Sequence, residues 1–119
     1  YVNRASPADV VRFLKTVREG DILTPENRKF FDKIMTATVT GGDKLKAGLP
    51  QGTVFGHKTG SSSRTAEGIK IADNDAGFVI LPDGRTYYIA VMVSDSRMSD
   101  RENAALAAEI SAVVYNRLR

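Results

Sequence analysis

The sequence predicts an α/β fold of the α+β kind, in which helices pack on an antiparallel sheet. Three segments begin with helix-capping residues, and two apolar segments flank the turn Pro82-Asp83-Gly84, which predicts an antiparallel hairpin. Both segments, Phe78–Leu81 and Ile89–Val93, are apolar at consecutive positions, so we expect both sheet faces to be covered. The predicted helices are too few for two full layers, and we expect more polypeptide, or a partner, to complete the fold.

Two helices are predicted in the first part of the chain. Ser6-Pro7 supplies an N-cap and a first-turn proline for a helix over residues 7–19, which Gly20 ends. Thr24-Pro25 begins the second helix in the same way, and Gly41-Gly42 ends it. The expected buried stripe of the first helix is Val10, Leu14 and Val17, and the apolar pairs of the second are Phe30 with Ile34 and Phe31 with Met35. We expect the two helices to pair.

The last helix is the best specified of the three. It starts with a capping box, Ser99-Asp100-Arg101-Glu102, and continues to the end of the chain. Its expected buried face carries Leu106, Ile110, Val113 and Val114.

Three strands are predicted, over residues 53–60, 75–82 and 85–94, with the first strand beside the hairpin. The chain is thus expected to form one unit without an interdomain linker, with a helical segment over 1–47 followed by three strands and the last helix over 48–119. Its length of 119 residues is that of one ordinary domain, and 42% hydrophobic and 26% charged residues are typical of a globular protein.

Composition excludes several classes of function. The chain has no cysteine, which excludes thiol catalysis and Cys-based metal sites, and its lone histidine, His57, cannot make a metal site. The net charge of +3 is spread among acidic residues, so we predict no nucleic-acid partner. The apolar runs are too short to span a bilayer, so we predict no membrane insertion. The Asp73 and Asp75 carboxylates fall in a predicted turn and are interpreted as structural.

The segment His57-Lys58-Thr59-Gly60-Ser61, at the end of the first predicted strand, is the strongest indication of function. An ammonium and two hydroxyls on a strand edge form a receptor for an anionic group such as a carboxylate. Gly60 leaves room for a substrate backbone, and exposed amides on the edge can pair with a substrate amide or stabilise an oxyanion. A Lys-Thr-Gly tripeptide on a strand is one of three motifs of serine β-lactamases and penicillin-binding proteins.

In this context the chain resembles the C-terminal half of a class A serine β-lactamase. The resemblance covers nearly the whole chain, and the start Tyr1-Val2-Asn3 and His57 are most similar to the extended-spectrum branch found in Bacteroides and relatives. It is carried by Gly48-Leu49-Pro50, His57-Lys58-Thr59-Gly60-Ser61, Asn74-Asp75-Ala76-Gly77, Leu81-Pro82-Asp83-Gly84-Arg85 and Ile89–Val93.

The resemblance implies a role for each matched residue. Lys58 would add positive potential beside the nucleophile, Thr59 and Ser61 would bind the β-lactam carboxylate, and Ser61 would also supply an oxyanion-hole amide. Gly60 would leave room for the substrate, and Asn74-Asp75 would support the strand. Arg64 follows the motif and is a further candidate for the substrate carboxylate.

The other motifs of the family are absent. The acylated serine of Ser-x-x-Lys, the Ser-Asp-Asn loop and the deacylating glutamate are not in this chain. The resemblance therefore implies that a missing N-terminal half completes the enzyme, that the isolated chain is inactive, and that the complete enzyme hydrolyses β-lactams without a metal or cofactor in the periplasm or outside the cell.

Two alternative functions remain open at this point. The chain can be a fragment of a penicillin-binding transpeptidase or carboxypeptidase, because Lys-Thr-Gly serves both classes. It can also be a noncatalytic module that captures carboxylated ligands on the edge formed by Lys58, Thr59 and Ser61. A local serine nucleophile is disfavoured, because His57 and the serines 61–63 lack an orienting acid and a nucleophile elbow.

Overall fold

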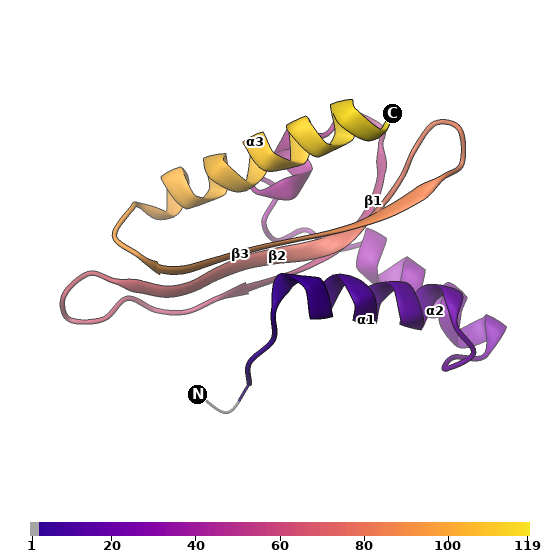
Figure 1. The fold of residues 1–119 in the computed structure, drawn as a ribbon, viewed down its shortest axis with the longest axis horizontal. Coiled ribbons are helices and arrows are strands. Elements are labelled where there is room, and N and C mark those ends of the chain that lie inside the picture. Colours follow the sequence, from indigo (N-terminus) through magenta and orange to yellow (C-terminus); the bar gives the residue numbers. More distant parts are fainter. Residues whose placement is uncertain (1–2) are drawn as a thin grey trace.

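A computed structural model describes residues 3–119; Tyr1 and Val2, which belong to the start quoted for the resemblance, lie outside the described residues. The helices α1 and α2 come first, then a short 3₁₀ helix η1, three strands and the helix α3 (Figure 1). Their bounds are α1 Pro7–Glu19, α2 Pro25–Thr36, η1 Leu45–Gly48, β1 Val54–Ser61, β2 Lys70–Ile80, β3 Thr86–Ser96 and α3 Asp100–Leu118.

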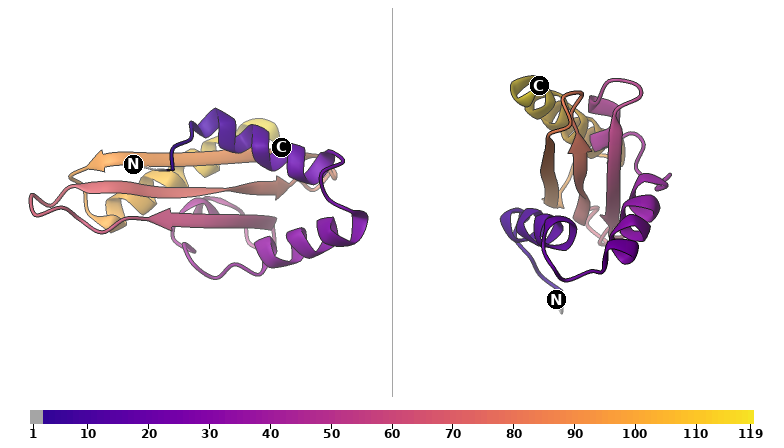
Figure 2. Two further views of the ribbon diagram at one scale, coloured as in Figure 1. Left: turned by 90° about the horizontal axis from the view of Figure 1, so that it is seen from below. Right: turned by 90° about the vertical axis from the view of Figure 1, so that its right-hand side faces the viewer.

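The three strands form one antiparallel sheet in the order β1-β2-β3, with α3 and η1 on one face and α1 and α2 on the other (Figure 2). The predicted α+β class is therefore confirmed. Among residues 3–119 no helix is both long and apolar enough to cross a membrane. The predicted division into 1–47 and 48–119 stays a prediction, and η1 crosses it.

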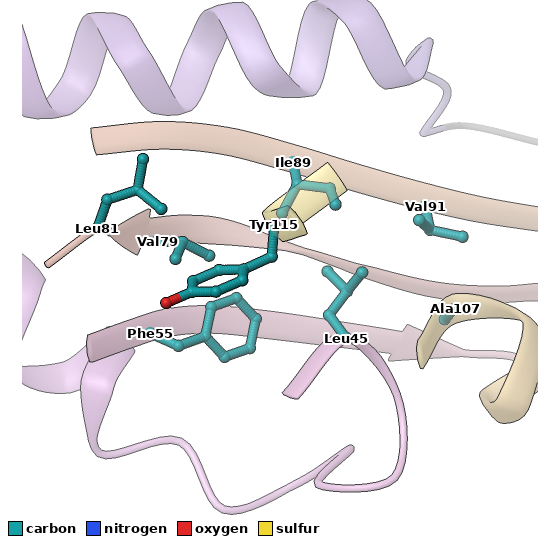
Figure 3. Packing of buried hydrophobic residues seen from close by; sticks show 8 residues of the cluster. All are labelled: Leu45, Phe55, Val79, Leu81, Ile89, Val91, Ala107 and Tyr115. Atoms are coloured by element: carbon teal, nitrogen blue, oxygen red, sulfur yellow. The ribbon is translucent and has the colours of Figure 1, made fainter. Parts of the chain in front are cut away.

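Two separate hydrophobic clusters cover the two faces of the sheet, because successive side chains of a strand point to opposite faces. Tyr115 of α3 lies over the sheet in the first cluster, close to Phe55 and Val79 (Figure 3). The second cluster packs Leu14 of α1 and Met35 of α2 around the fully buried Phe78.

The helix starts are where the capping residues predict them. The hydroxyl of Ser6 accepts from the amide of Asp9 at 3.1 Å, and that of Thr24 accepts from the amide of Asn27 at 3.2 Å. The capping box between Ser99 and Glu102 is also present. These are local hydrogen bonds within one turn, which is why the sequence alone indicates them.

Other boundaries differ from the predictions. The second helix ends at Thr36, five residues before Gly41, and β2 begins at Lys70 instead of residue 75. Instead of packing mainly on each other, α1 lies on β2 and β3 and α2 lies on β1. A two-pronged ion pair joins Arg18 to Asp32, with both N–O distances at 2.8 Å. The guanidinium also lies 3.9 Å from the centre of the Phe78 ring.

The predicted buried face of α3 is wrong for three of its four residues; the fourth, Val114, is partly buried and packs against the first cluster. Leu106, Ile110 and Val113 are 39%, 36% and 69% exposed, while α3 buries Asn103, Ala104, Ala107, Ser111 and Tyr115. The reason is close backbone contact: a Cβ at Gly48 of η1 would overlap the carbonyl oxygen of Ala108. Only small side chains fit at this contact, so the larger apolar ones face outward.

Candidate functional site

The Lys-Thr-Gly segment lies on β1, at the edge of the sheet. Lys58, Gly60 and Ser61 are exposed and Thr59 is half-buried. The Lys58 ammonium donates to the carbonyl of Thr59 at 2.6 Å. A Cβ at Gly60 would meet no atom within 4 Å, so the space beside this backbone is open.

Backbone hydrogen bonds show which way the amides of β1 point. The amide of Ser62 donates to Ala72 of β2 at 2.9 Å, whereas the carbonyl of His57 accepts from the Thr38 hydroxyl at 2.7 Å. Because successive residues alternate between the two sides of a strand, the amide of Ser61 points away from β2. This is the free edge on which a ligand can add its own hydrogen bonds.

The loop between α2 and η1 runs along β1. The hydroxyls of Thr40 and Thr59 are 3.1 Å apart, and a Cβ at Gly41 would overlap the methyl group of Thr59. Gly41 has φ of +66°, which a glycine adopts without strain. The Thr59 side chain points to the same face of the sheet as Phe55, so the loop fixes it from the face that carries η1.

A buried carboxylate lies directly behind the end of the motif. Ser61 and Asp73 are cross-strand partners, and the Ser61 hydroxyl donates to Asp73 at 2.8 Å. The Lys44 ammonium also bonds to this carboxylate, and Asn103 of α3 donates to its other oxygen at 3.4 Å. Burial by itself would raise the pKa of Asp73, but the hydrogen bonds from Lys44 and Ser61 outweigh it and lower the pKa below its ordinary value of 3.8.

A second carboxylate supports the strand from the same face. Nδ1 of His57 lies 2.9 Å from Asp75, and the other oxygen of Asp75 accepts from the amide of Leu45 at 3.2 Å. Both side chains are almost fully buried, and the imidazole stacks on Phe55 with ring centres 4.4 Å apart. The pair ties β1, β2 and η1 together immediately before Lys58.

The two carboxylates correct one interpretation from the sequence. Asp73 and Asp75 lie within β2, not in a turn, because β2 begins at Lys70. Their roles as partners of other side chains agree with the structural interpretation. Among residues 3–119 no group of three or more acidic or histidine side chains is placed to hold a metal ion.

Arg64 does not gather with the other candidate residues. Its guanidinium donates to the carbonyls of Gly68 and Met98 at 2.8 Å each and to the Asp100 carboxylate at 2.6 Å. Lys70 lies 3.4 Å from the same carboxylate, and hydrogen bonds from Arg64 and Lys70 lower the pKa of Asp100. These contacts clamp the β1–β2 turn to the start of α3.

The sequence did not single out Lys44 or Thr40. Both lie in the loop beside β1 and reach the motif across 17 and 19 residues of chain. Neither belongs to a recognisable motif, so only the tertiary contact identifies them.

A hollow of about 470 Å³ lies between the segment before α1 and the strands β2 and β3. Asn74, the cross-strand partner of Gly60, is among its lining residues.

Comparisons with known proteins agree with this geometry. A model of the β-lactamase enzyme family matches residues 2–118. A β-lactamase of Bacteroides uniformis is 51% identical over 120 residues, which cover 100% of this chain and 40% of the relative. The extended-spectrum β-lactamase PER-1 of Pseudomonas aeruginosa is 39% identical, with 97% of this chain and 37% of the relative covered.

Solved structures give the same result. A class A β-lactamase from Bacteroides cellulosilyticus superimposes with a TM-score of 0.93 at 53% identity, covering 96% of this chain and 41% of that one. The TLA-3 extended-spectrum β-lactamase superimposes with a TM-score of 0.96 at 41% identity, covering 99% and 43%. The chain thus spans about 40% of the length of these relatives. It belongs to the β-lactamase enzyme family, and its solved relative from Bacteroides is a class A enzyme.

Proposed function

We propose that this chain is part of a class A β-lactamase that hydrolyses β-lactams through a serine acyl-enzyme, and that β1 forms one wall of the substrate site. The observation that carries this proposal is the exposed Lys58 beside the open space at Gly60 on a free sheet edge, in a chain of the β-lactamase family. A periplasmic or secreted location of the complete enzyme follows from the same likeness. No metal or organic cofactor is part of the proposal.

Each residue of the motif has a separate role in this proposal. The Lys58 ammonium attracts the substrate carboxylate and raises the potential beside the nucleophile, and the Thr59 hydroxyl donates to that carboxylate. The outward amide of Ser61 stabilises the oxyanion that forms when the β-lactam carbonyl is attacked. The Ser61 hydroxyl already donates its hydrogen to Asp73, so the structure supports a role for the Ser61 amide in substrate binding better than one for the hydroxyl.

The nucleophile and the acid/base residues belong, in this proposal, to polypeptide outside the 119 residues. The outward apolar face of α3 supports this, because Leu106 and Val113 are large, exposed and adjacent to a well-packed core. Phe13 of α1 and Phe30 of α2 are 63% and 60% exposed on the other side of the sheet. Both outer surfaces are therefore suited to contact the rest of a larger enzyme.

Kinetics on the complete enzyme test the assignment. Lys58→Ala and Thr59→Val are expected to lower kcat/KM for β-lactams by about tenfold or more while the urea midpoint stays unchanged, since each removes a donor to the substrate. Lys46→Ala removes an exposed lysine of η1 and is the matched control. Unchanged kinetics in both variants would remove the assigned roles.

Intact-mass analysis with a slowly hydrolysed β-lactam tests the chemistry. We expect one covalent adduct on a serine outside residues 1–119, followed by its loss as the ester is hydrolysed. An adduct that never turns over would indicate a transpeptidase instead. Saturable binding without any adduct would favour a noncatalytic carboxylate-binding module, and a label on serines 61–63 would overturn the assignment of the nucleophile.

A further inference from the structure

The buried carboxylate of Asp73 is a feature that the proposed reaction does not use. Its side chain is 3% exposed, and it bonds to the Lys44 ammonium, whose side chain is 12% exposed. The Ser61 hydroxyl donates to the same oxygen at 2.8 Å. A negative charge thus lies directly opposite Ser61 and two residue pairs away from Thr59, in a site proposed to bind an anion.

The contacts of Asp73 occupy the two groups that would otherwise serve a substrate carboxylate. A hydroxyl has a single hydrogen, so Ser61 cannot donate to Asp73 and to a ligand at the same time. The Lys44 ammonium lies 3.4 Å from the Ser61 hydroxyl, and its charge is balanced by Asp73. Lys58, by contrast, is exposed, and within residues 3–119 its ammonium donates only to the Thr59 carbonyl.

The charged side chains of the elements packed around this edge of β1 determine its net charge. Two lysines lie near the strand edge: Lys58 on β1 and Lys44 in the loop before η1. The nearby negative charge is Asp73 of β2, which is bonded to Lys44. From α3, the neutral Asn103 also bonds to Asp73. The Asp75 carboxylate is held by His57. Arg64 and Lys70 are engaged with Asp100. Of these basic side chains around β1, in the part of the chain that the structure describes, Lys58 alone has no carboxylate partner and is left to face a ligand.

We propose that Asp73 is a specificity-determining residue of the site: by holding Lys44 and the Ser61 hydroxyl, it restricts the edge to one anionic group and disfavours β-lactams that carry a second carboxylate. This inference rests on the proposed function, because it concerns the ligand of the same site. Asp73 acts through Lys44 and Ser61 and does not itself touch the substrate.

The Lys44–Asp73 pair can be tested in four forms: unmodified, without the negative charge, without the positive charge, and without both. Each substitution changes the shape of the side chain little. Asp73→Asn keeps an acceptor for Ser61 and Lys44 but removes the negative charge. It is expected to lower KM by about tenfold for a β-lactam with two carboxylates and by less for one with a single carboxylate. The reason is that the Lys44 ammonium, no longer balanced by Asp73, attracts the second carboxylate with the energy of a unit charge near a protein surface. The KM of a neutral β-lactam ester and all kcat values are expected to stay the same, because the effect is one of ground-state and transition-state binding alike.

Two further variants are expected to change KM in the opposite direction or to leave it unchanged. Lys44→Met leaves Asp73 unbalanced and is expected to raise KM for both carboxylated substrates. The double variant Lys44→Met with Asp73→Asn removes a neutral pair and is expected to return KM close to that of the unmodified enzyme. Asp83→Asn, in the exposed β2–β3 turn where Asp83 bonds to Arg85, removes one negative charge away from the site and serves as the control.

The KM values, measured on the complete enzyme, separate failure of this inference from failure of the proposed function. A higher KM of Asp73→Asn for carboxylated substrates would overturn the inference, because Asp73 would then present Lys44 to the substrate instead of withholding it. Equal changes for the ester and the dicarboxylate would overturn it as well, since charge would not be the cause. Normal hydrolysis with no effect of Asp73→Asn would refute this inference alone, whereas an unmodified enzyme that hydrolyses none of the three substrates would refute the proposed function.

Discussion

Two glycines on either side of the β1–β2 pairing are expected to respond to the same substitution in opposite ways. Gly77 is the cross-strand partner of His57, and a Cβ there would overlap the carbonyl oxygen of Gly56 and lie 2.8 Å from the Cβ of His57. Gly60 lies on the same pair of strands, but a Cβ there would meet no atom within 4 Å. Neither glycine has a positive φ, so alanine strains neither backbone.

The loss of stability in Gly77→Ala follows from that contact. Adding a methyl group to a packed interior costs about 1–3 kcal/mol, and the upper half applies here because a backbone oxygen cannot rotate away. Replacing glycine by alanine also restricts the unfolded chain, which returns about 0.4–1 kcal/mol. The expected net loss is about 2 kcal/mol in the free energy of unfolding, with the His57–Asp75 pair displaced as β1 and β2 separate.

Gly60→Ala is the matched variant, with the same chemical change and no clash. Its stability is expected to be equal to that of the unmodified protein or higher by less than about 1 kcal/mol. Its kcat/KM for β-lactams is expected to fall, because the new methyl group enters the space assigned to the substrate. Urea unfolding and steady-state kinetics of both variants in the complete enzyme measure the two effects. An undiminished stability of Gly77→Ala would refute the packing argument, and an undiminished activity of Gly60→Ala would refute the substrate position.

Three further predictions concern stability. Phe78→Ala is expected to cost about 3–5 kcal/mol in urea unfolding, because the ring is fully buried beneath Arg18. Leu106→Ser is expected to destabilise the complete enzyme by more than the ~0.5 kcal/mol typical of surface sites if further polypeptide covers α3, and a smaller loss would contradict that cover. The lowered pKa of Asp73 stabilises the folded state above the ordinary aspartate pKa of 3.8, and this contribution is lost as pH falls through the lowered value. Asp73→Asn is therefore expected to be less stable at neutral pH and to approach the unmodified protein at low pH; a constant difference in urea midpoint would contradict this.

Local chemistry explains which elements the sequence could predict. The starts of α1, α2 and α3 depend on hydrogen bonds that span three residues, as between Ser99 and Glu102, so a short segment contains the whole signal. The β2–β3 hairpin is equally local, with the amide of Leu81 donating to Arg85 at 2.8 Å across the turn. The resemblance to the family likewise depends on short segments, of which His57–Ser61 is one, read together along the chain.

Contacts between distant segments explain what the sequence could not predict. The buried face of α3 is decided by how closely Gly48 approaches Ala108, and the usual rule that large apolar residues face inward fails at such a contact. The bond between Lys44 and Asp73 joins residues 29 positions apart, and nothing in either neighbourhood indicates the other. Arg64 was a candidate for the substrate because it follows the motif, but its three hydrogen bonds favour a structural role.

The placement of α1 on the far side of the sheet has a consequence for the order in which the chain assembles. Arg18 reaches the Tyr88 hydroxyl of β3 at 3.3 Å across 70 residues, whereas β2 and β3 meet across a short turn. Closing the shorter loop costs less entropy, so we expect the β2–β3 hairpin to form first and α1 to dock late. Pulse-labelled hydrogen exchange during refolding would show early protection of β2 and β3. The helix that comes first in the chain would then be among the last to gain protection.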